Sequence, residues 1–246
     1  MRIIAFVSLL LIVAGRIYLV IDIGPENSTK NRFHKHRDWA SAIVSKTGET
    51  PVVFYNSYQR ASLFWFYSGV PSHSHNWYGE RRSNYNFWPT ENNLLGKPVF
   101  LADINGIDRF SDSVITTKGV VGLTYDSMYA ALGAIQIIPS SDMIVTGQNK
   151  KISIQSKIRL PYRYGMFLDS NKDPETKVMA GIFRGKEMIK EIETGLSAQN
   201  IFGLWNFDVP LNLENIRPGK YDLRLGIASK NYPITHNSEK IYLEIR

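Results

Sequence analysis

Apolar and polar positions divide the chain into three parts with different patterns. Residues 3–21 are apolar except for Ser8, Gly15 and Arg16. A helix of this length spans roughly 28 Å, close to the hydrocarbon thickness of a bilayer. Arg2 is the only charged side chain before the run, so the positive-inside rule places the N-terminus in the cytoplasm. Residues 1–23 are therefore predicted to form a single-pass helix in the inner (cytoplasmic) membrane, with the rest of the chain extracytoplasmic or periplasmic.

A cleaved signal peptide is the competing interpretation of the same segment. Residues 3–14 would be its apolar region, and Val13, Ala14 and Gly15 offer small residues before a cut. In a retained helix, Arg16 would snorkel toward the interface or pair with a neighbouring helix, because an arginine inside a membrane is costly. Both interpretations place the remaining chain outside the cytoplasm, and the pattern leaves them open.

Residues 24–132 predict a small α/β domain that follows a polar linker over 24–36. Asp38 can cap a helix that continues to about Lys46, with Trp39, Ile43 and Val44 on one face. The apolar run 51–56 is typical of a buried strand, and 57–69 predicts a helix with Ser57 as N-cap and Gly69 as its stop. A further strand is predicted over 98–103. Helices alternating with buried strands indicate an α/β layer.

Residues 133–246 change to short alternating segments, which predict an antiparallel β-sandwich. Together with the α/β domain, this gives an α+β fold class. The predicted strands, separated by turn signals such as Pro218-Gly219, cover residues 135–138, 151–160, 177–184, 204–209, 221–228 and 240–245.

Composition excludes several classes of function. The chain has 246 residues, 43% hydrophobic and 21% charged, so it is not disordered overall. It contains no cysteine, which excludes disulfides, thiolate metal sites and a cysteine nucleophile. The net charge of +7 is dispersed, without a basic run, so no nucleic-acid partner is expected.

The strongest candidate for a binding site is an aromatic-rich stretch over residues 54–88. It holds twelve of the thirty aromatic residues together with arginines and amides, and its only acid is Glu80. Rings cover the apolar faces of sugars, and arginine binds anionic oxygens with two hydrogen bonds. The competing interpretation is a small core rich in aromatics, with Arg81 and Arg82 solvated or lying on the rings. The candidate ligand-binding residues are Tyr58, Gln59, Arg81, Arg82, Asn84, Tyr85 and Trp88.

Other polar motifs favour structural roles. His73 and His75 resemble half of a metal site, but no nearby acid or histidine completes it, so a loop is expected there. Residues 233–238 are predicted to form a structured turn in which Thr235 and Asn237 bond the backbone. No pair of carboxylates, catalytic triad or phosphate-binding loop can be assigned. The sequence therefore predicts no catalytic residue, no metal and no cofactor.

Several motifs resemble the C-terminal part of bacterial family 39 glycosyltransferases, which are similar to protein mannosyltransferases and the aminoarabinose transferase of lipid A. The motifs that carry the resemblance are Asn56-Ser57-Tyr58-Gln59, Trp65-Phe66-Tyr67-Ser68-Gly69, Arg81-Arg82-Ser83-Asn84-Tyr85 with Trp88, and Pro233-Ile234-Thr235-His236-Asn237-Ser238. The resemblance covers most of residues 16–246. It implies a GT-C type membrane protein that uses a polyprenyl-phosphate sugar and acts on a glycan or lipid acceptor.

The family's catalytic acid lies in the first extracytoplasmic loop, which has no counterpart in this sequence. The resemblance therefore implies a non-catalytic, membrane-anchored C-terminal or accessory region, as a fragment, a split subunit or a stand-alone remnant. Its expected partners are the lipid bilayer, a polyprenyl-phosphate sugar and a polytopic glycosyltransferase segment. The alternative is an exported carbohydrate-binding or structural β-sandwich protein with a cleaved signal peptide. A hydrolase is a weaker third hypothesis, because no acid–base pair is present.

Overall fold

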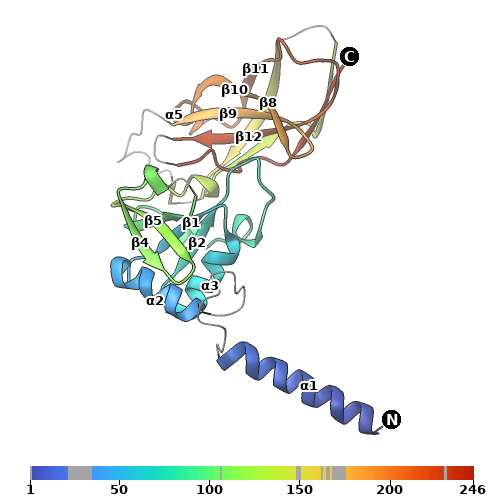
Figure 1. Cartoon of the computed structure of the whole chain (residues 1–246). Helices are drawn as coiled ribbons and strands as arrows, with labels where there is room; N and C mark the ends of the chain where they lie inside the picture. The colour runs from blue at the N-terminus through green and yellow to red at the C-terminus, as the bar shows by residue number, and fades with distance from the viewer. Residues whose placement is uncertain are drawn as a thin grey trace.

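The N-terminal apolar run forms one helix. The computed structural model describes residues 2–21, 35–105, 107–147, 151–161, 163–164, 167, 176–229 and 232–246. Helix α1 (Arg2–Ile21) projects from the end of the molecule where α2 and α3 lie (Figure 1), and its side chains are exposed from Ile3 to Ile17. Within the described residues, no helix combines the length and the apolar character needed to cross a membrane. The predicted linker over 24–36 lies outside the described residues up to residue 34.

Five strands form a mixed sheet that follows α1 in the chain. Its elements are α2 (His36–Thr47), β1 (Val52–Tyr55), α3 (Tyr58–Ser68), β2 (Ser72–His75), β3 (Val99–Asp103), β4 (Asp112–Thr116) and β5 (Gly119–Asp126). The strand order is β2-β1-β3-β5-β4. Strand β1 is parallel to both β2 and β3, whereas β5 is antiparallel to β3 and β4.

Local sequence accounts for α2 and α3. Ser57 precedes α3 and its hydroxyl accepts a hydrogen bond from the Arg60 amide at 3.4 Å, as an N-cap does. Gly69 ends α3 in the left-handed region, at φ 75°, where glycine has no steric penalty. Both end signals predicted from the sequence are confirmed. Asp38 was predicted to be the N-cap of α2, but it lies in the first turn of the helix, whose N-cap is Lys35.

The two faces of this sheet belong to different cores, because neighbouring side chains of a strand point to opposite faces. Val52 and Phe54 pack with Trp39 and Ile43 of α2 and Phe64 of α3. On the other face, Val53 joins Val99 and Leu101 in a core shared with the C-terminal sheets. The parallel strands are thus covered on both sides.

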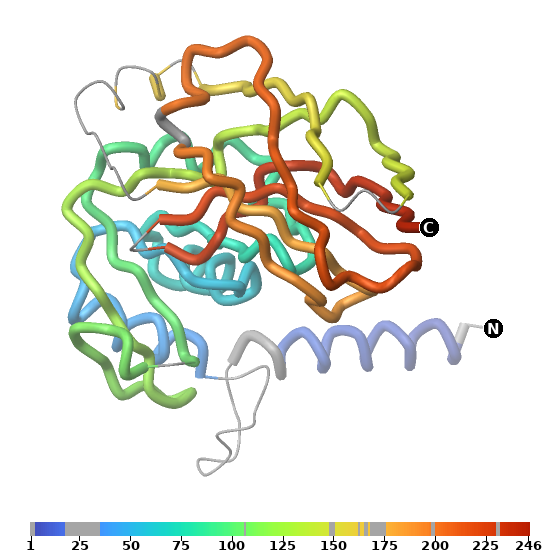
Figure 2. The backbone as a smooth tube through the Cα atoms, turned by 90° about the horizontal axis from the view of Figure 1, so that it is seen from above, coloured from blue at the N-terminus to red at the C-terminus, as the bar shows by residue number. Residues whose placement is uncertain are grey.

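Two sheets make up the C-terminal part of the chain. Figure 2 traces the backbone of this part in yellow to red, up to the C-terminus. Their strands are β6 (Gln136–Pro139), β7 (Met143–Thr146), β8 (Lys151–Arg159), β9 (Lys177–Arg184), β10 (Glu187–Ser197), β11 (Phe207–Asn212), β12 (Gly219–Ala228) and β13 (Ile241–Ile245), with the short helix α5 (Ala198–Ile201) between β10 and β11. The strand orders are β10-β9-β12-β13-β7 and β11-β8-β6. Most pairs are antiparallel, but β13 and β7 run parallel, which corrects the prediction of a purely antiparallel arrangement.

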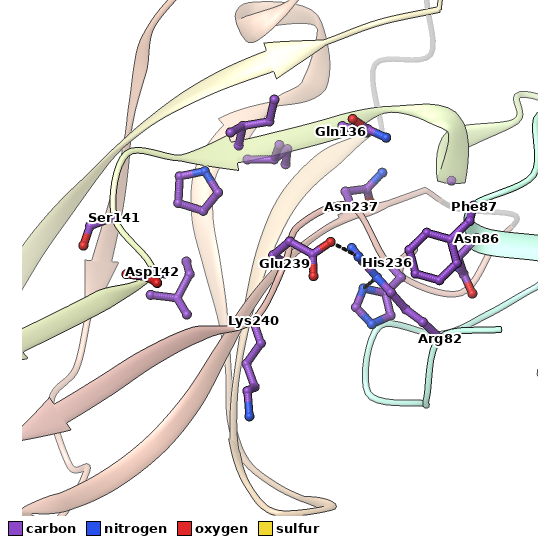
Figure 3. A pocket seen from close by; sticks show the side chains of 15 residues that line it. Arg82, Asn86, Phe87, Gln136, Ser141, Asp142, His236, Asn237, Glu239 and Lys240 are labelled. Carbon is purple, nitrogen blue, oxygen red and sulfur yellow. Dashed lines mark hydrogen bonds and ion pairs between the residues drawn. The ribbon is translucent and has the colours of Figure 1, made fainter. Parts of the chain in front are cut away.

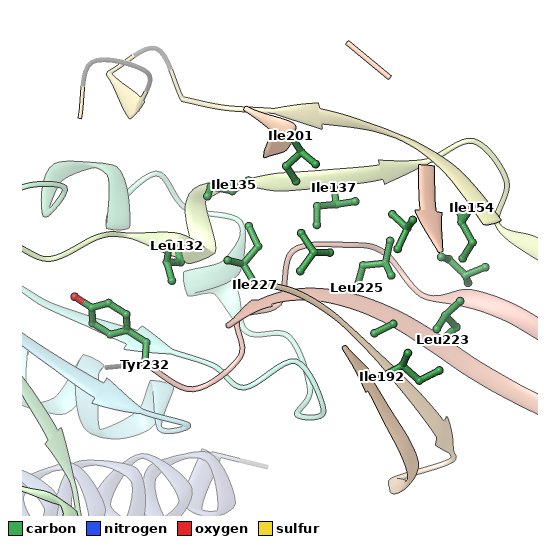
Figure 4. Packing of buried hydrophobic residues seen from close by; sticks show 14 of the residues in the cluster. Leu132, Ile135, Ile137, Ile154, Ile192, Ile201, Leu223, Leu225, Ile227 and Tyr232 are labelled. Atoms are coloured by element: carbon green, nitrogen blue, oxygen red, sulfur yellow. The ribbon is translucent and has the colours of Figure 1, made fainter. Parts of the chain in front are cut away.

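The α+β fold class is confirmed, and more residues lie in strands than in helices. Figure 4 shows side chains of both C-terminal sheets meeting in one apolar cluster, with Ile137 and Ile154 from one sheet and Leu223 and Leu225 from the other. This packing is compatible with the predicted β-sandwich. Because the same cluster includes Val53 and Leu101, the core is continuous with the N-terminal sheet.

Two predicted segments differ from the structure, and four further strands were not predicted. The predicted loop at His73 and His75 is β2, a buried strand paired in parallel with β1. The segment predicted over 204–209 is shifted, because β11 begins at Phe207. Strands β4, β5, β7 and β10 were not predicted. Strand β10 pairs only with β9 at the edge of its sheet, and its outward positions carry charges that weaken the alternating pattern.

Gly226 of β12 lies where the segment 232–238 crosses the strand. A Cβ atom at this position would lie 2.5 Å from both the Thr235 carbonyl oxygen and a methyl carbon of Ile234. We expect Gly226→Ala to lower the free energy of unfolding by about 2 kcal/mol, because the backbone must shift to admit the methyl group. Urea unfolding measures the change. Gly147→Ala is the matched control, since nothing lies within 4 Å of its Cβ, and equal effects of the two variants would contradict this account.

Candidate functional site

A cleft of about 1050 Å³ is lined by residues of the N-terminal sheet and of the C-terminal part of the chain. One side is built by β1, β3 and β5 with the residues that follow them, and the other by β10, the end of β12 and the segment 232–234. Its lining includes Tyr55, Asn56, Trp77, Leu101, Asp103, Asn105, Arg109, Phe110, Thr124, Tyr125, Asp126, Met188, Glu191, Tyr232, Pro233 and Ile234.

The topology of the parallel strands explains why part of the cleft lies here. Strand β1 lies between β2 and β3. The connection after β1 therefore leads to one side of it, and the connection after β2 leads back across to the other side. Ligands of open α/β sheets bind outside the carboxyl ends of the strands at such a reversal of strand order. Asn56 follows β1 at φ 50°, an uncommon angle for a residue other than glycine, and Asp103 ends β3.

Tyr55 forms the floor of the cleft between two carboxylates. Its ring centroid lies 6.0 Å from that of Phe110 and 5.6 Å from that of His75. Burial raises the pKa of the Tyr55 hydroxyl well above its usual value, and the charges of Asp126 and Asp103 raise it further. The hydroxyl therefore stays protonated at neutral pH.

The opposite wall holds one of these carboxylates in place. The Tyr232 hydroxyl donates a hydrogen bond to Asp126 Oδ2, and the Met128 amide donates to Asp126 Oδ1 at 2.9 Å. Burial, followed by the contact with Asp126, raises the pKa of Tyr232 well above its usual range. The Tyr232 ring stacks on His75 with centroids 5.9 Å apart. Asp126 is thus a positioned hydrogen-bond acceptor.

The polar side chains of Asp103, Asn105 and Arg109 line another part of the cleft. Asp103 Oδ1 accepts hydrogen bonds from the amides of Ile104 at 2.7 Å and Asn105 at 3.2 Å, which fixes the turn after β3. Arg109 and Asn105 line the cleft and are exposed. Aromatic faces beside carboxylates, an amide and a guanidinium suit a ligand with several hydroxyl groups and an anionic group.

A buried polar cluster lies behind the floor of the cleft. The Tyr129 hydroxyl donates to Glu91 Oε1 at 2.9 Å, and the Gly133 amide donates to the same oxygen at 3.2 Å. His75 Nδ1 lies 3.2 Å from the Tyr129 hydroxyl, and His73 Nε2 lies 3.6 Å from Glu91 Oε2. Glu91 belongs to the short helix η2 (Glu91–Asn93).

Burial sets the protonation of this cluster. It raises the pKa of Glu91 to about 7, against the lowering effect of its bonds from Tyr129 and Gly133. It lowers the pKa of His73 to about 3 and that of His75 to about 4. Both imidazoles are therefore neutral at pH 7, and Glu91 is about half protonated near that pH. Because a carbonyl can only accept a hydrogen bond, the neutral His75 ring donates from Nε2 to the Pro233 carbonyl, 3.0 Å away.

Glu91 is the acid that sequence reasoning did not place beside the histidine pair. Because β2 is a strand, the two histidines lie on one face of the sheet, and η2 brings Glu91 to His73. Even so, no three or more His, Asp or Glu side chains among the described residues are arranged so that they could hold a metal ion. We interpret the cluster as a structural support for the cleft.

A second, smaller cavity of about 240 Å³ contains one of the predicted binding residues, Arg82 (Figure 3). The guanidinium of Arg82 donates to the Ser238 carbonyl at 2.8 Å and to His236 Nδ1 at 3.4 Å, and it forms an ion pair with Glu239. Its carbon Cζ also lies 5.6 Å from the centre of the Phe87 ring. Arg82 therefore joins the two parts of the chain.

The structure does not gather the seven predicted binding residues into one site. Tyr58 and Gln59 begin α3, whereas Asn84 and Tyr85 lie in the short helix η1 (Asn84–Asn86). Tyr85 is buried, and its hydroxyl lies 3.1 Å from Ser62 Oγ. Arg81 and Trp88 are exposed. Of these seven described residues, only Arg82 lines either of the two cavities.

Sequence reasoning missed most of the residues that line the cleft. Asp103 and Asn105 could have been selected, because they follow a predicted buried strand of an α/β layer, where ligand groups gather. Asp126, Tyr232 and Ile234 carry no such signal, since only the packing of distant segments brings them to Tyr55.

Comparisons with known proteins do not assign a family. No protein-family model and no curated protein matches the chain. One chain of a structure described as the basis of T cell specificity and activation by the bacterial superantigen toxic shock syndrome toxin-1 is similar at 9% identity and a TM-score of 0.26, covering 46% of this chain and 99% of that chain.

Two extracellular domains described as parts of hybrid two-component systems of B. thetaiotaomicron are also similar. Their identities are 11% and 10%, and their TM-scores are 0.26 and 0.28. The matches cover 54% and 55% of this chain but only 18% and 19% of those chains. Scores this low carry no argument about the function of this chain.

Proposed function

We propose that this chain is the membrane-anchored extracytoplasmic C-terminal or accessory region of a polyprenyl-phosphate-sugar-dependent glycosyltransferase, non-catalytic on its own, and that its sugar site is the cleft. The lining of the cleft carries the proposal. Tyr55, Trp77 and Tyr232 offer ring faces, while Asp103 and Asp126 offer acceptors for sugar hydroxyls. The residues that resemble family 39 glycosyltransferases support a lipid-linked sugar as the ligand.

In this proposal α1 anchors the chain in the inner membrane, and the C-terminal sheets form a β-sandwich that is one wall of the site. The exposed apolar side chains of α1 support the anchor. The exposed guanidinium of Arg109 would bind the phosphate of the ligand, because arginine pairs with phosphate through two parallel hydrogen bonds. The partner of the whole chain in this proposal is a polytopic glycosyltransferase segment.

Binding to a short-chain polyprenyl-phosphate hexose, with a free hexose 1-phosphate as a second probe, tests the proposal. Saturation-transfer NMR on the full chain measures it. We expect Arg109→Ala to weaken binding about 10-fold, as the loss of a charge-assisted hydrogen bond would. Arg81→Ala is the matched control, at an exposed arginine that lines neither cavity. If only the Arg81 variant loses binding, the ligand site lies in the aromatic-rich stretch and not in the cleft. If neither probe binds the wild-type chain, the proposal is refuted.

The second candidate is an exported carbohydrate-binding or structural protein with a cleaved signal peptide. The small residues Val13, Ala14 and Gly15 favour it, together with the shared core of the C-terminal sheets. Mass spectrometry of the mature N-terminus separates the candidates. A chain that begins at Arg16 supports cleavage, and an intact Met1 in the membrane fraction supports the anchor.

A further inference from the structure

The outward face of α3 is aromatic, although the exposed face of a surface helix is usually polar. Tyr58, Ser62, Trp65 and Phe66 are spaced so that they share one side of the helix. Tyr58 is 40% exposed, Trp65 39% and Phe66 79%. The opposite side carries the buried Phe64. The aromatic side chains on the outward face therefore do not belong to the hydrophobic core.

The short helix η1 extends this surface. The Tyr85 hydroxyl lies 3.1 Å from Ser62 Oγ, which holds η1 against α3. The Trp88 ring packs on Tyr85 with centroids 5.7 Å apart, and Trp88 is 51% exposed. We call Tyr58, Trp65, Phe66 and Trp88 the aromatic face.

Charge on α3 is compatible with an anionic surface. The helix has Arg60 as its only charged residue and contains no aspartate or glutamate. Negatively charged lipid headgroups attract basic side chains near them, and they repel acidic ones. The composition therefore carries no electrostatic penalty against a bilayer.

The aromatic face lies at the end of the molecule that the chain enters from α1. The Phe66 ring contacts Tyr67 with centroids 5.0 Å apart, and Tyr67 stacks on His36 at 5.9 Å. His36 begins α2, and residues 22–35 separate it from the end of α1. A chain of that length reaches at most roughly 50 Å. In Figure 1, α2 and α3 form the end nearest α1, and the C-terminal sheets lie at the far end.

We propose that the aromatic face is a second membrane contact, placed at the level of the lipid headgroups. Tryptophan and tyrosine are enriched there because one part of each ring system is apolar and another is polar. The inference rests on the proposed anchoring by α1. It adds that the part of the chain after α1 is oriented with α3 against the bilayer.

Tryptophan fluorescence in vesicles tests this contact. The full chain is reconstituted in phosphatidylcholine–phosphatidylglycerol vesicles that contain lipids brominated near the headgroup end of the acyl chain. We expect quenching in the Trp65→Phe, Trp88→Phe double variant to fall to about half or less of the wild-type quenching, since these rings would lie at the interface. Trp205→Phe is the matched control, because Trp205 is 88% exposed in the C-terminal part, and it should leave quenching unchanged.

Flotation of the same vesicles separates the two proposals. If the wild-type chain floats but the double variant is quenched as strongly as the wild type, the lipid contact of the aromatic face is refuted. The anchoring by α1 is then still supported. Blue-shifted Trp65 and Trp88 emission without quenching would mean burial against protein, and it would also overturn a lipid contact. A chain that does not float refutes the anchor and, with it, this inference. Phe66→Asp should lower quenching without changing flotation.

Discussion

Replacing Asn237 by alanine is expected to lower the free energy of unfolding by about 4 kcal/mol, because three buried backbone groups lose their partner. The Asn237 side-chain amide donates to the carbonyls of Leu132 and Ile135, each at 2.8 Å, and its oxygen accepts from the Ile227 amide at 2.8 Å. The residue is 2% exposed, so water cannot replace these bonds.

Urea unfolding of the full chain measures the effect. Asn92→Ala provides the control, since Asn92 is exposed in η2, and it should change stability by less than about 0.5 kcal/mol. The bonds of Asn237 connect the start of β6 to β12, so the change should also shift the whole transition rather than unfold a loop. A loss below about 1 kcal/mol would show that these bonds are not a major support of the fold.

Glutamine in place of Glu91 is expected to become relatively more stabilising as the pH rises. The folded-state pKa of Glu91 is about 7, above the ordinary glutamate value of 4.5, so the folded protein binds this proton more tightly than the unfolded chain. The stability that this proton contributes is fully present below about pH 4.5 and is lost as the pH rises through 7. Over that window, the difference between wild type and Glu91→Gln should change by about 3 kcal/mol in favour of the variant.

Unfolding of both proteins at pH 4.5, 6 and 7.5 checks this result. His73 and His75 act in the opposite direction, because their lowered pKa values contribute stability above pH 6.5 that is lost on acidification. Comparing the two proteins cancels that shared contribution. Glu80→Gln is the matched control at an exposed carboxylate. A difference that stays constant with pH would contradict a raised pKa for Glu91.

Elements whose signals are local were predicted well from the sequence. Ser57 and Gly69 delimit α3 as expected, and the side chains of Thr235 and Asn237 bond the backbone as expected. Strand β2 was missed because Ser72, His73, Ser74 and His75 form a polar sequence. Their partners, which include the Ala61 carbonyl, Thr90 and Tyr129, come from other segments of the chain.

The candidate site was harder to predict because it is built by packing between segments. The aromatic-rich stretch was the candidate ligand site, with an aromatic core as the competing interpretation, and in the structure Tyr85 is buried while Arg82 is engaged by Ser238 and Glu239. Asp126 and Tyr232 are 106 residues apart, and their contact depends on how the C-terminal sheets dock on the N-terminal sheet. No spacing in the sequence encodes that contact.

Hydrogen–deuterium exchange of the full chain, with and without a short-chain polyprenyl-phosphate hexose, tests the central claim most directly. The cleft predicts slower exchange in peptides that cover residues 103–110 and 232–234 when the probe is bound, with little change elsewhere in the described chain. Protection confined to residues 81–88, with unchanged exchange around Asp103 and Tyr232, would contradict the account and place the ligand in the aromatic-rich stretch instead.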